Sequence, residues 1–134
     1  MGIIPHYHTE INDLILDLEE TFNAKIIDMS KYNQWTDVID EILSCDFIIS
    51  ESLHGLIVAE AYCVPNKWVE FMEHDEKLTF KFYDFYESIH KYNMKSLKLY
   101  QDSSLNLENL KNSWTKAENL DEITTVLESL YGKL

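Results

Sequence analysis

The chain contains only three glycines and two prolines among its 134 residues, and no stretch of it is rich in either. Flexible linkers between domains are usually rich in such residues. Since no internal repeat or low-complexity tract is present either, no boundary inside the chain is indicated. An apolar fraction of 46% is enough for a packed core at this length. We therefore expect a single domain over residues 1–134.

Cysteine is equally scarce. Cys45 and Cys63 have neither the spacing of metal ligands nor the density of a disulfide scaffold. Both lie in apolar stretches, and a free cysteine there behaves as a small hydrophobic residue. We therefore expect two buried free thiols.

Basic residues and long hydrophobic runs are also lacking. Eleven lysines, with no arginine, stand against 24 acidic residues, which gives a formal net charge of −13 and excludes diffuse attraction to nucleic acid or an anionic membrane. No run approaches the roughly 20 apolar residues that span a bilayer, and no basic segment followed by an apolar one opens the chain. We expect a cytoplasmic protein without a membrane span.

The glycine-rich signatures of phosphate chemistry are missing as well. The sequence has no Gly-x-Gly-x-x-Gly, no P-loop and no Gly-x-Ser-x-Gly. Nucleotide-phosphate hydrolysis and α/β-hydrolase chemistry therefore lose their usual support, and no cofactor is predicted.

Apolar runs and helical periodicity alternate along the chain. The run at residues 46–50 (Asp-Phe-Ile-Ile-Ser) is typical of a strand that is buried on both faces. Thr9 is the expected N-cap of the first helix. Strands are predicted at residues 2–5, 24–29, 46–50, 66–71 and 96–100, and helices at residues 10–20, 36–43, 53–64, 77–90 and 119–130. This alternation predicts an α/β fold, a Rossmann-like parallel sheet with helices on both faces.

The turn from the strand at residues 46–50 into the next helix is the strongest candidate site. Such a turn brings backbone N–H groups and the positive end of a helix dipole to the sheet edge, which suits phosphate or carboxylate. Ser52 is a plausible N-cap, Ser50 ends the strand, and Gly55 admits either a ligand or a neighbouring backbone. His54 would face the same space, although a histidine beside a glycine is more often structural than catalytic.

Two further histidines follow the first strand. His6 comes directly after Pro5, so it would share a crevice with His54 if the two strands are neighbours. The alternative is a solvated loop over residues 6–8. His6, His8 and His54 are conceivable metal ligands, but no acidic or cysteine partner completes a site, and no metal is predicted.

Five aromatic residues crowd the helix at residues 77–90, and they admit two interpretations. A core role is the commoner one at helical spacing, and a surface on which sugars stack is the alternative. The five are Phe80, Phe82, Tyr83, Phe85 and Tyr86.

Several blocks of the sequence resemble the bacterial polysaccharide pyruvyl transferases. The blocks are residues 2–7, residues 46–62 with Ser-Glu-Ser-Leu-His-Gly at their centre, residues 64–68 and residues 80–88. They occur in the family's order and extend to about Ser88. Arg often stands in related proteins where Ser52 and Tyr83 stand here, and Gly where Cys63 stands.

This resemblance implies a fold and an activity. The chain would be the C-terminal half of a GT-B-like enzyme whose N-terminal domain is absent, and which transfers the enolpyruvyl unit of phosphoenolpyruvate to a sugar hydroxyl in capsule or exopolysaccharide biosynthesis. Leu53 and His54 would lie at the phosphoenolpyruvate site, with His54 protonating the enol methylene or neutralising the leaving phosphate. The residues expected to bind substrate are Ser50, Ser52, Leu53, Gly55 and His6.

Other functions stay open at this point. Without the second domain the chain would be inactive alone, and an open cleft that exposes apolar surface would favour self-association. One alternative is a non-catalytic binding or assembly module that keeps the fold. Another is the donor-binding half of a nucleotide-sugar glycosyltransferase.

Overall fold

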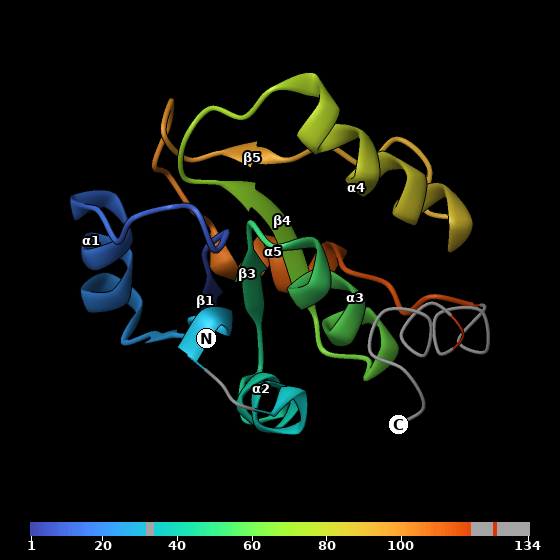
Figure 1. Cartoon of the computed structure of the whole chain (residues 1–134), viewed down its shortest axis with the longest axis horizontal. Helices are drawn as coiled ribbons and strands as arrows, with labels where there is room; N and C mark the ends of the chain where they lie inside the picture. Colours follow the sequence, from blue (N-terminus) through green and yellow to red (C-terminus); the bar gives the residue numbers. More distant parts are fainter. Residues whose placement is uncertain (32–33, 119–124, 126–134) are drawn as a thin grey trace.

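A computed structural model describes residues 1–31, 34–118 and 125 of the chain (Figure 1). Strands and helices alternate, as the sequence predicts. The strands are β1 (Gly2–Ile4), β2 (Lys25–Ile26), β3 (Ile48–Ser50), β4 (Asn66–Glu70) and β5 (Leu97–Lys98). The helices are α1 (Asp13–Phe22), a 3₁₀ turn (Met29–Lys31), α2 (Trp35–Leu43), α3 (Leu53–Ala61), α4 (Glu76–Ser88) and α5 (Leu107–Ser113).

The five strands form one parallel sheet in the order β2-β1-β3-β4-β5. The chain adds β2 on one side of β1, then crosses over through α2 and adds β3 on the other side. The sheet is thus doubly wound, and the predicted Rossmann-like α/β class is confirmed. The winding direction reverses between β1 and β3, and ligands of such folds bind at the carboxyl ends of the strands at this switch point.

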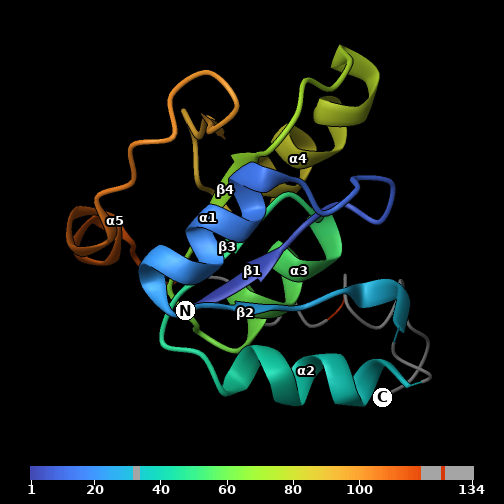
Figure 2. The same cartoon turned by 90° about the vertical axis from the view of Figure 1, so that its left-hand side faces the viewer.

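Two hydrophobic cores cover the two faces of the sheet, because neighbouring strand residues point to opposite faces. Ile4 and Ile48 belong to the core shared with α2, α3 and α4. Ile3 and Ile49 belong to the core shared with α1 and α5. Figure 2 shows α1 and α5 on one side of the sheet and α3 on the other.

The helix α3 is buried nearly all round, which agrees with a sequence that is apolar apart from His54 and Glu60. It is shorter than the predicted residues 53–64, since the helix ends at Ala61. Cys63 adopts a left-handed conformation (φ 58°), and the N–H of Val64 then bonds back to the carbonyl of Ala59 at 2.8 Å. Such a left-handed residue ends many helices and is usually glycine.

Other predictions need correction. Asn12, not Thr9, caps α1, because its side chain accepts the N–H of Ile15, while the Thr9 hydroxyl bonds elsewhere. Cys45 and Cys63 are free thiols, but both are only half-buried.

Element bounds also shift. The strands predicted at residues 24–29, 46–50, 66–71 and 96–100 are each shorter in the structure, because pairing with a neighbour ends before the apolar run does. The helix α5 was not predicted. The helix predicted at residues 119–130 lies outside the described residues, apart from position 125.

Candidate functional site

The carboxyl ends of β1 and β3 lie side by side, since Ile4 pairs with Ser50 in the parallel register. His6 follows β1, and the turn into α3 follows β3. The structure therefore brings His6 and His54 to one hollow of about 160 Å³, as the sequence hypothesis required. We call it the His54 hollow, and its lining is His6, Tyr7, Ser52, Leu53, His54, Leu78, Lys81 and Phe82.

Two of the predicted substrate-binding residues, Ser52 and Leu53, and the predicted catalytic residue His54 line this hollow at the amino end of α3. Ser52 is the N-cap, as predicted, and its hydroxyl oxygen accepts the N–H of Gly55 at 3.4 Å. Leu53 and His54 are the first two residues of the helix. The positive end of the helix dipole thus faces the hollow, which favours a negatively charged ligand.

Ser50 and Gly55 have a different role from the predicted one, because they shape the corner and do not line the hollow. The fully buried Ser50 hydroxyl accepts the N–H of Ser52 at 3.0 Å and donates to its carbonyl oxygen at 2.8 Å. A Cβ added at Gly55 would lie 2.7 Å from the Ser50 Oγ and 2.8 Å from the Ile4 Cδ1. Neighbouring side chains, not a ligand, occupy the space that the glycine leaves.

Charge in the hollow comes from Lys81, which sequence reasoning missed. Partial burial and the Lys81 ammonium lower the pKa of His54. Burial and the nearby His74 lower the pKa of His6, although Glu51 opposes them. Both imidazoles are therefore mainly neutral at neutral pH, and Lys81 is the cation. Among the described residues, no carboxylate lines the hollow.

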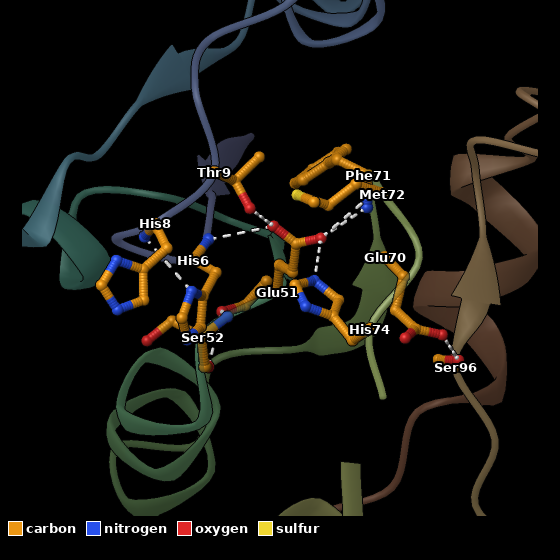
Figure 3. A network of polar contacts seen from close by, with 11 residues as sticks. His6, His8, Thr9, Glu51, Ser52, Glu70, Phe71, Met72, His74 and Ser96 are labelled. Carbon is orange, nitrogen blue, oxygen red and sulfur yellow. Dashed lines mark hydrogen bonds and ion pairs between the residues drawn. The ribbon is translucent and has the colours of Figure 1, made fainter. Parts of the chain in front are cut away.

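Glu51 is the most strongly bonded residue of the site and was also missed. Its side chain is buried, with a relative exposure of 1%. Figure 3 shows its carboxylate between the loops that carry Thr9 and His74. Oε1 accepts two hydrogen bonds and Oε2 three, from the N–H of His6 (3.1 Å), the hydroxyl of Thr9 (2.7 Å), the N–H of Phe71 (2.7 Å), the N–H of Met72 (3.3 Å) and Nε2 of His74 (2.8 Å). Glu51 thereby joins the loop after β1 to the loop after β4.

The protonation state of Glu51 follows from these bonds. Burial alone would raise the pKa of the carboxyl, but hydrogen bonds from Thr9, His74 and two backbone N–H groups outweigh it and lower the pKa. Glu51 is ionised at neutral pH, so His74 donates from Nε2. The position of Glu51 in the sequence indicated such a role, because an acidic residue between a buried strand and a buried helix needs hydrogen-bond partners.

His74 completes a group of imidazoles around Glu51. Its ring centroid lies 5.6 Å from that of His6, and His6 in turn accepts the backbone N–H of His8 at Nδ1, 3.2 Å away. Residues 7–8 form a turn in which Tyr7, with a relative exposure of 69%, and His8 are exposed, so the solvated-loop interpretation holds for these two. His6 is half-buried and lines the His54 hollow. Within the described part of the chain, no group of three or more His, Cys, Asp or Glu residues is arranged to hold a metal ion.

The aromatic stretch on α4 divides between the two interpretations. Three of its residues are buried in the core, namely Phe82, Phe85 and Tyr86. Phe80 and Tyr83 instead point outward, with relative exposures of 67% and 46%. The core interpretation is therefore correct for Phe82, Phe85 and Tyr86 only.

The fold and the site define a Rossmann-like α/β sheet with an anion-suited hollow at its switch point. An uncharacterized protein, L143 of Acanthamoeba polyphaga mimivirus, is 33% identical over 87 residues, which are 63% of this chain and 30% of that protein. The chain therefore spans under a third of that relative's length. No protein-family model and no solved structure matches the chain. Across the described ranges, no helix is long and apolar enough to cross a bilayer.

Proposed function

We propose that this chain is the phosphoenolpyruvate-binding domain of a pyruvyl transferase-like protein of capsule or exopolysaccharide biosynthesis in the cytoplasm. Its partners would be phosphoenolpyruvate, a sugar or glycan and, through the apolar surface of an open cleft, a second copy of the chain. The observation that carries the proposal is the His54 hollow itself. There the amino end of α3, the imidazole of His54 and the ammonium of Lys81 surround one space.

The hollow suits the charges of phosphoenolpyruvate. The phosphate would bind at the amino end of α3, where backbone N–H groups and the helix dipole favour an anion. Lys81 supplies a cation beside it. The pyruvyl transferases that the sequence resembles often have Arg where Ser52 and Tyr83 stand, and Lys81 would provide a positive charge in their place. The resemblance and the geometry thus support the same ligand.

His54 would carry the proton that the reaction needs. Its lowered pKa leaves His54 neutral at neutral pH, and an incoming phosphate would raise that pKa again. The protonated ring would then give its proton to the enol methylene. The hydroxyl oxygen of a sugar would form a bond to the carbon that bears the phosphate, and the proton of that hydroxyl would return to the now neutral His54. Phosphate would leave with the electrons of its C–O bond. A second hydroxyl of the sugar would bond to the same carbon and give its proton to the departing phosphate, which closes a pyruvate ketal.

Binding is the direct test. Phosphoenolpyruvate should raise the melting temperature of the chain, by an amount that corresponds to about 2.7 kcal/mol when its concentration is about 100 times the dissociation constant. UDP-glucose should give no shift. H54Q and K81M should weaken phosphoenolpyruvate binding about tenfold or more, because each removes a charged or hydrogen-bonding contact. K116M, at an exposed position that does not line the hollow, is the matched control.

The pH dependence adds a second criterion. Because binding favours the charged form of His54, affinity should rise as the pH falls from about 8 to about 6.5, and H54Q should lose this part of the dependence. No shift with phosphoenolpyruvate would refute the proposal. A shift with UDP-glucose alone would favour a glycosyltransferase half, and phosphoenolpyruvate binding that H54Q leaves intact would favour a non-catalytic module.

A further inference from the structure

A second hollow, of about 520 Å³, lies along the first turns of α4 and shares no lining residue with the His54 hollow. It is bounded by the end of β4, by α4 and by the segment around β5. Its lining includes Glu70, Phe80, Tyr83, Ser96, Lys98 and Tyr100. We call this second hollow the Glu70 groove.

Glu70 differs from the other buried glutamates of the described residues. Glu51 accepts five hydrogen bonds, and Glu60 is bonded by Lys91, Asn66 and Trp114. Glu70 is 4% exposed, yet its Oε2 accepts only the Ser96 hydroxyl, at 2.6 Å. Figure 3 shows its side chain pointing away from Glu51 toward Ser96.

This leaves acceptor capacity on Glu70. An ionised carboxylate offers about four acceptor positions, and Oε1 is not one of the fully buried unbonded oxygens of the described residues, which are Glu41 Oε2 and the Tyr86 hydroxyl, so it is open to the groove. No donor in residues 1–31, 34–118 and 125 reaches Oε1 of Glu70. A ligand in the groove that carries hydroxyl groups would supply the missing donors.

Aromatic surface adjoins this carboxylate. Phe80 and Tyr83 are neighbours on α4 at a spacing of three residues, and both are exposed, while three other aromatics of the same stretch are buried. Tyr100 lines the groove from the segment after β5. Exposed aromatic faces beside a concave site with a few polar groups are characteristic of ligand pockets.

The polar groups select the kind of ligand. Glu70, Glu73 and Glu76 disfavour an anion such as phosphoenolpyruvate or a nucleotide sugar. The ammonium of Lys98 disfavours a cationic amine. It can also donate hydrogen bonds to a ligand, which the ionised carboxylates cannot do. Sugar hydroxyls both donate and accept, and the apolar face of a sugar ring packs on aromatic rings.

We propose that the Glu70 groove binds a sugar ring, with Phe80 and Tyr83 against its apolar face and Glu70 accepting its hydroxyl groups. Only the naming of this sugar as the acceptor of the pyruvyl unit rests on the proposed function. The His54 hollow would then hold phosphoenolpyruvate, the donor of the pyruvyl unit, and the Glu70 groove would hold the sugar that accepts it. The two hollows lie on adjacent sides of the first half of α4.

The test is a titration of the chain with chitobiose, lactose and maltose, followed by ligand-observed NMR. At least one of these sugars should bind saturably. F80A and E70Q should each weaken that binding about fivefold or more, since F80A removes an exposed ring and E70Q removes a charged acceptor while keeping the oxygen that Ser96 bonds. Y92A is the matched control, because Tyr92 is an equally exposed aromatic outside the groove.

The outcomes separate this proposal from the previous one. The proposal for the Glu70 groove is refuted if none of the three sugars binds saturably. It is also refuted if spermidine binds to the chain and both E70Q and F80A abolish that binding. Sugar binding that Y92A weakens as much as F80A also overturns it. Phosphoenolpyruvate binding should be unchanged in F80A and E70Q. Sugar binding without any phosphoenolpyruvate binding would keep the groove and refute the transferase function.

Discussion

Replacing Glu51 by Gln is the sharpest perturbation of the fold around the site. The substitution keeps the shape of the side chain but puts an NH₂ group where one carboxylate oxygen accepts hydrogen bonds. The lowest-energy orientation of the glutamine amide places its NH₂ at the position of Oε1. There the Thr9 hydroxyl can rotate to accept a hydrogen bond from it, but the N–H of His6 is left without an acceptor. The three donors at Oε2 keep an acceptor, though an uncharged one.

The cost can be worked from these contacts. Leaving a buried N–H without an acceptor costs about 1–3 kcal/mol. A hydrogen bond to a charged acceptor stabilises the fold by up to about 1 kcal/mol more than one to a neutral acceptor. The free energy of unfolding of E51Q should therefore fall by about 3 kcal/mol, which corresponds to a melting temperature lower by about 10 °C. Urea unfolding measures the former directly. E10Q, at an exposed loop position, is the control.

The same prediction has a definite pH dependence. The pKa of Glu51 is lowered in the folded state from its ordinary value of 4.5, so ionised Glu51 stabilises the fold above that value. This contribution is lost as the pH falls through the lowered pKa. The difference in stability between the wild type and E51Q should thus be constant near neutral pH and shrink in acid. A difference that is no larger than that of E10Q, or that does not change with pH, would refute the reasoning.

Two further substitutions test the packing around the site. G55A should lower the free energy of unfolding by about 1–3 kcal/mol in urea titrations, because the added Cβ would lie 2.7 Å from the Ser50 hydroxyl oxygen; unchanged stability would mean that the corner is looser than described. K91M should cost about 3–5 kcal/mol in the same assay, because it leaves the buried Glu60 carboxylate, 2.9 Å from the Lys91 ammonium, without its counter-ion. K111M removes a surface ion pair and should cost less than about 1 kcal/mol, so equal losses in the two lysine variants would contradict this account.

The sequence by itself determined the fold class and the corner that holds His54. Uninterrupted apolar runs mark the strands of a parallel sheet, and helical periodicity marks the crossovers between them, so local pattern was sufficient. The cap at Ser52 was also predictable, since capping depends on residues three apart. Element ends were less predictable, as at Cys63, where a left-handed residue that is not glycine ends α3.

Only the tertiary structure decided which residues share a site. Thr9 looked like a helix cap, yet it donates to Glu51, 42 residues away. Lys81 carries no local signal, and it reaches the His54 hollow only because α4 packs against the same face of the sheet as α3. Phe80 and Phe82 have similar side chains, but packing buries one and leaves the other exposed. Local pattern specifies elements, whereas the burial of charge and the lining of hollows depend on contacts between distant segments.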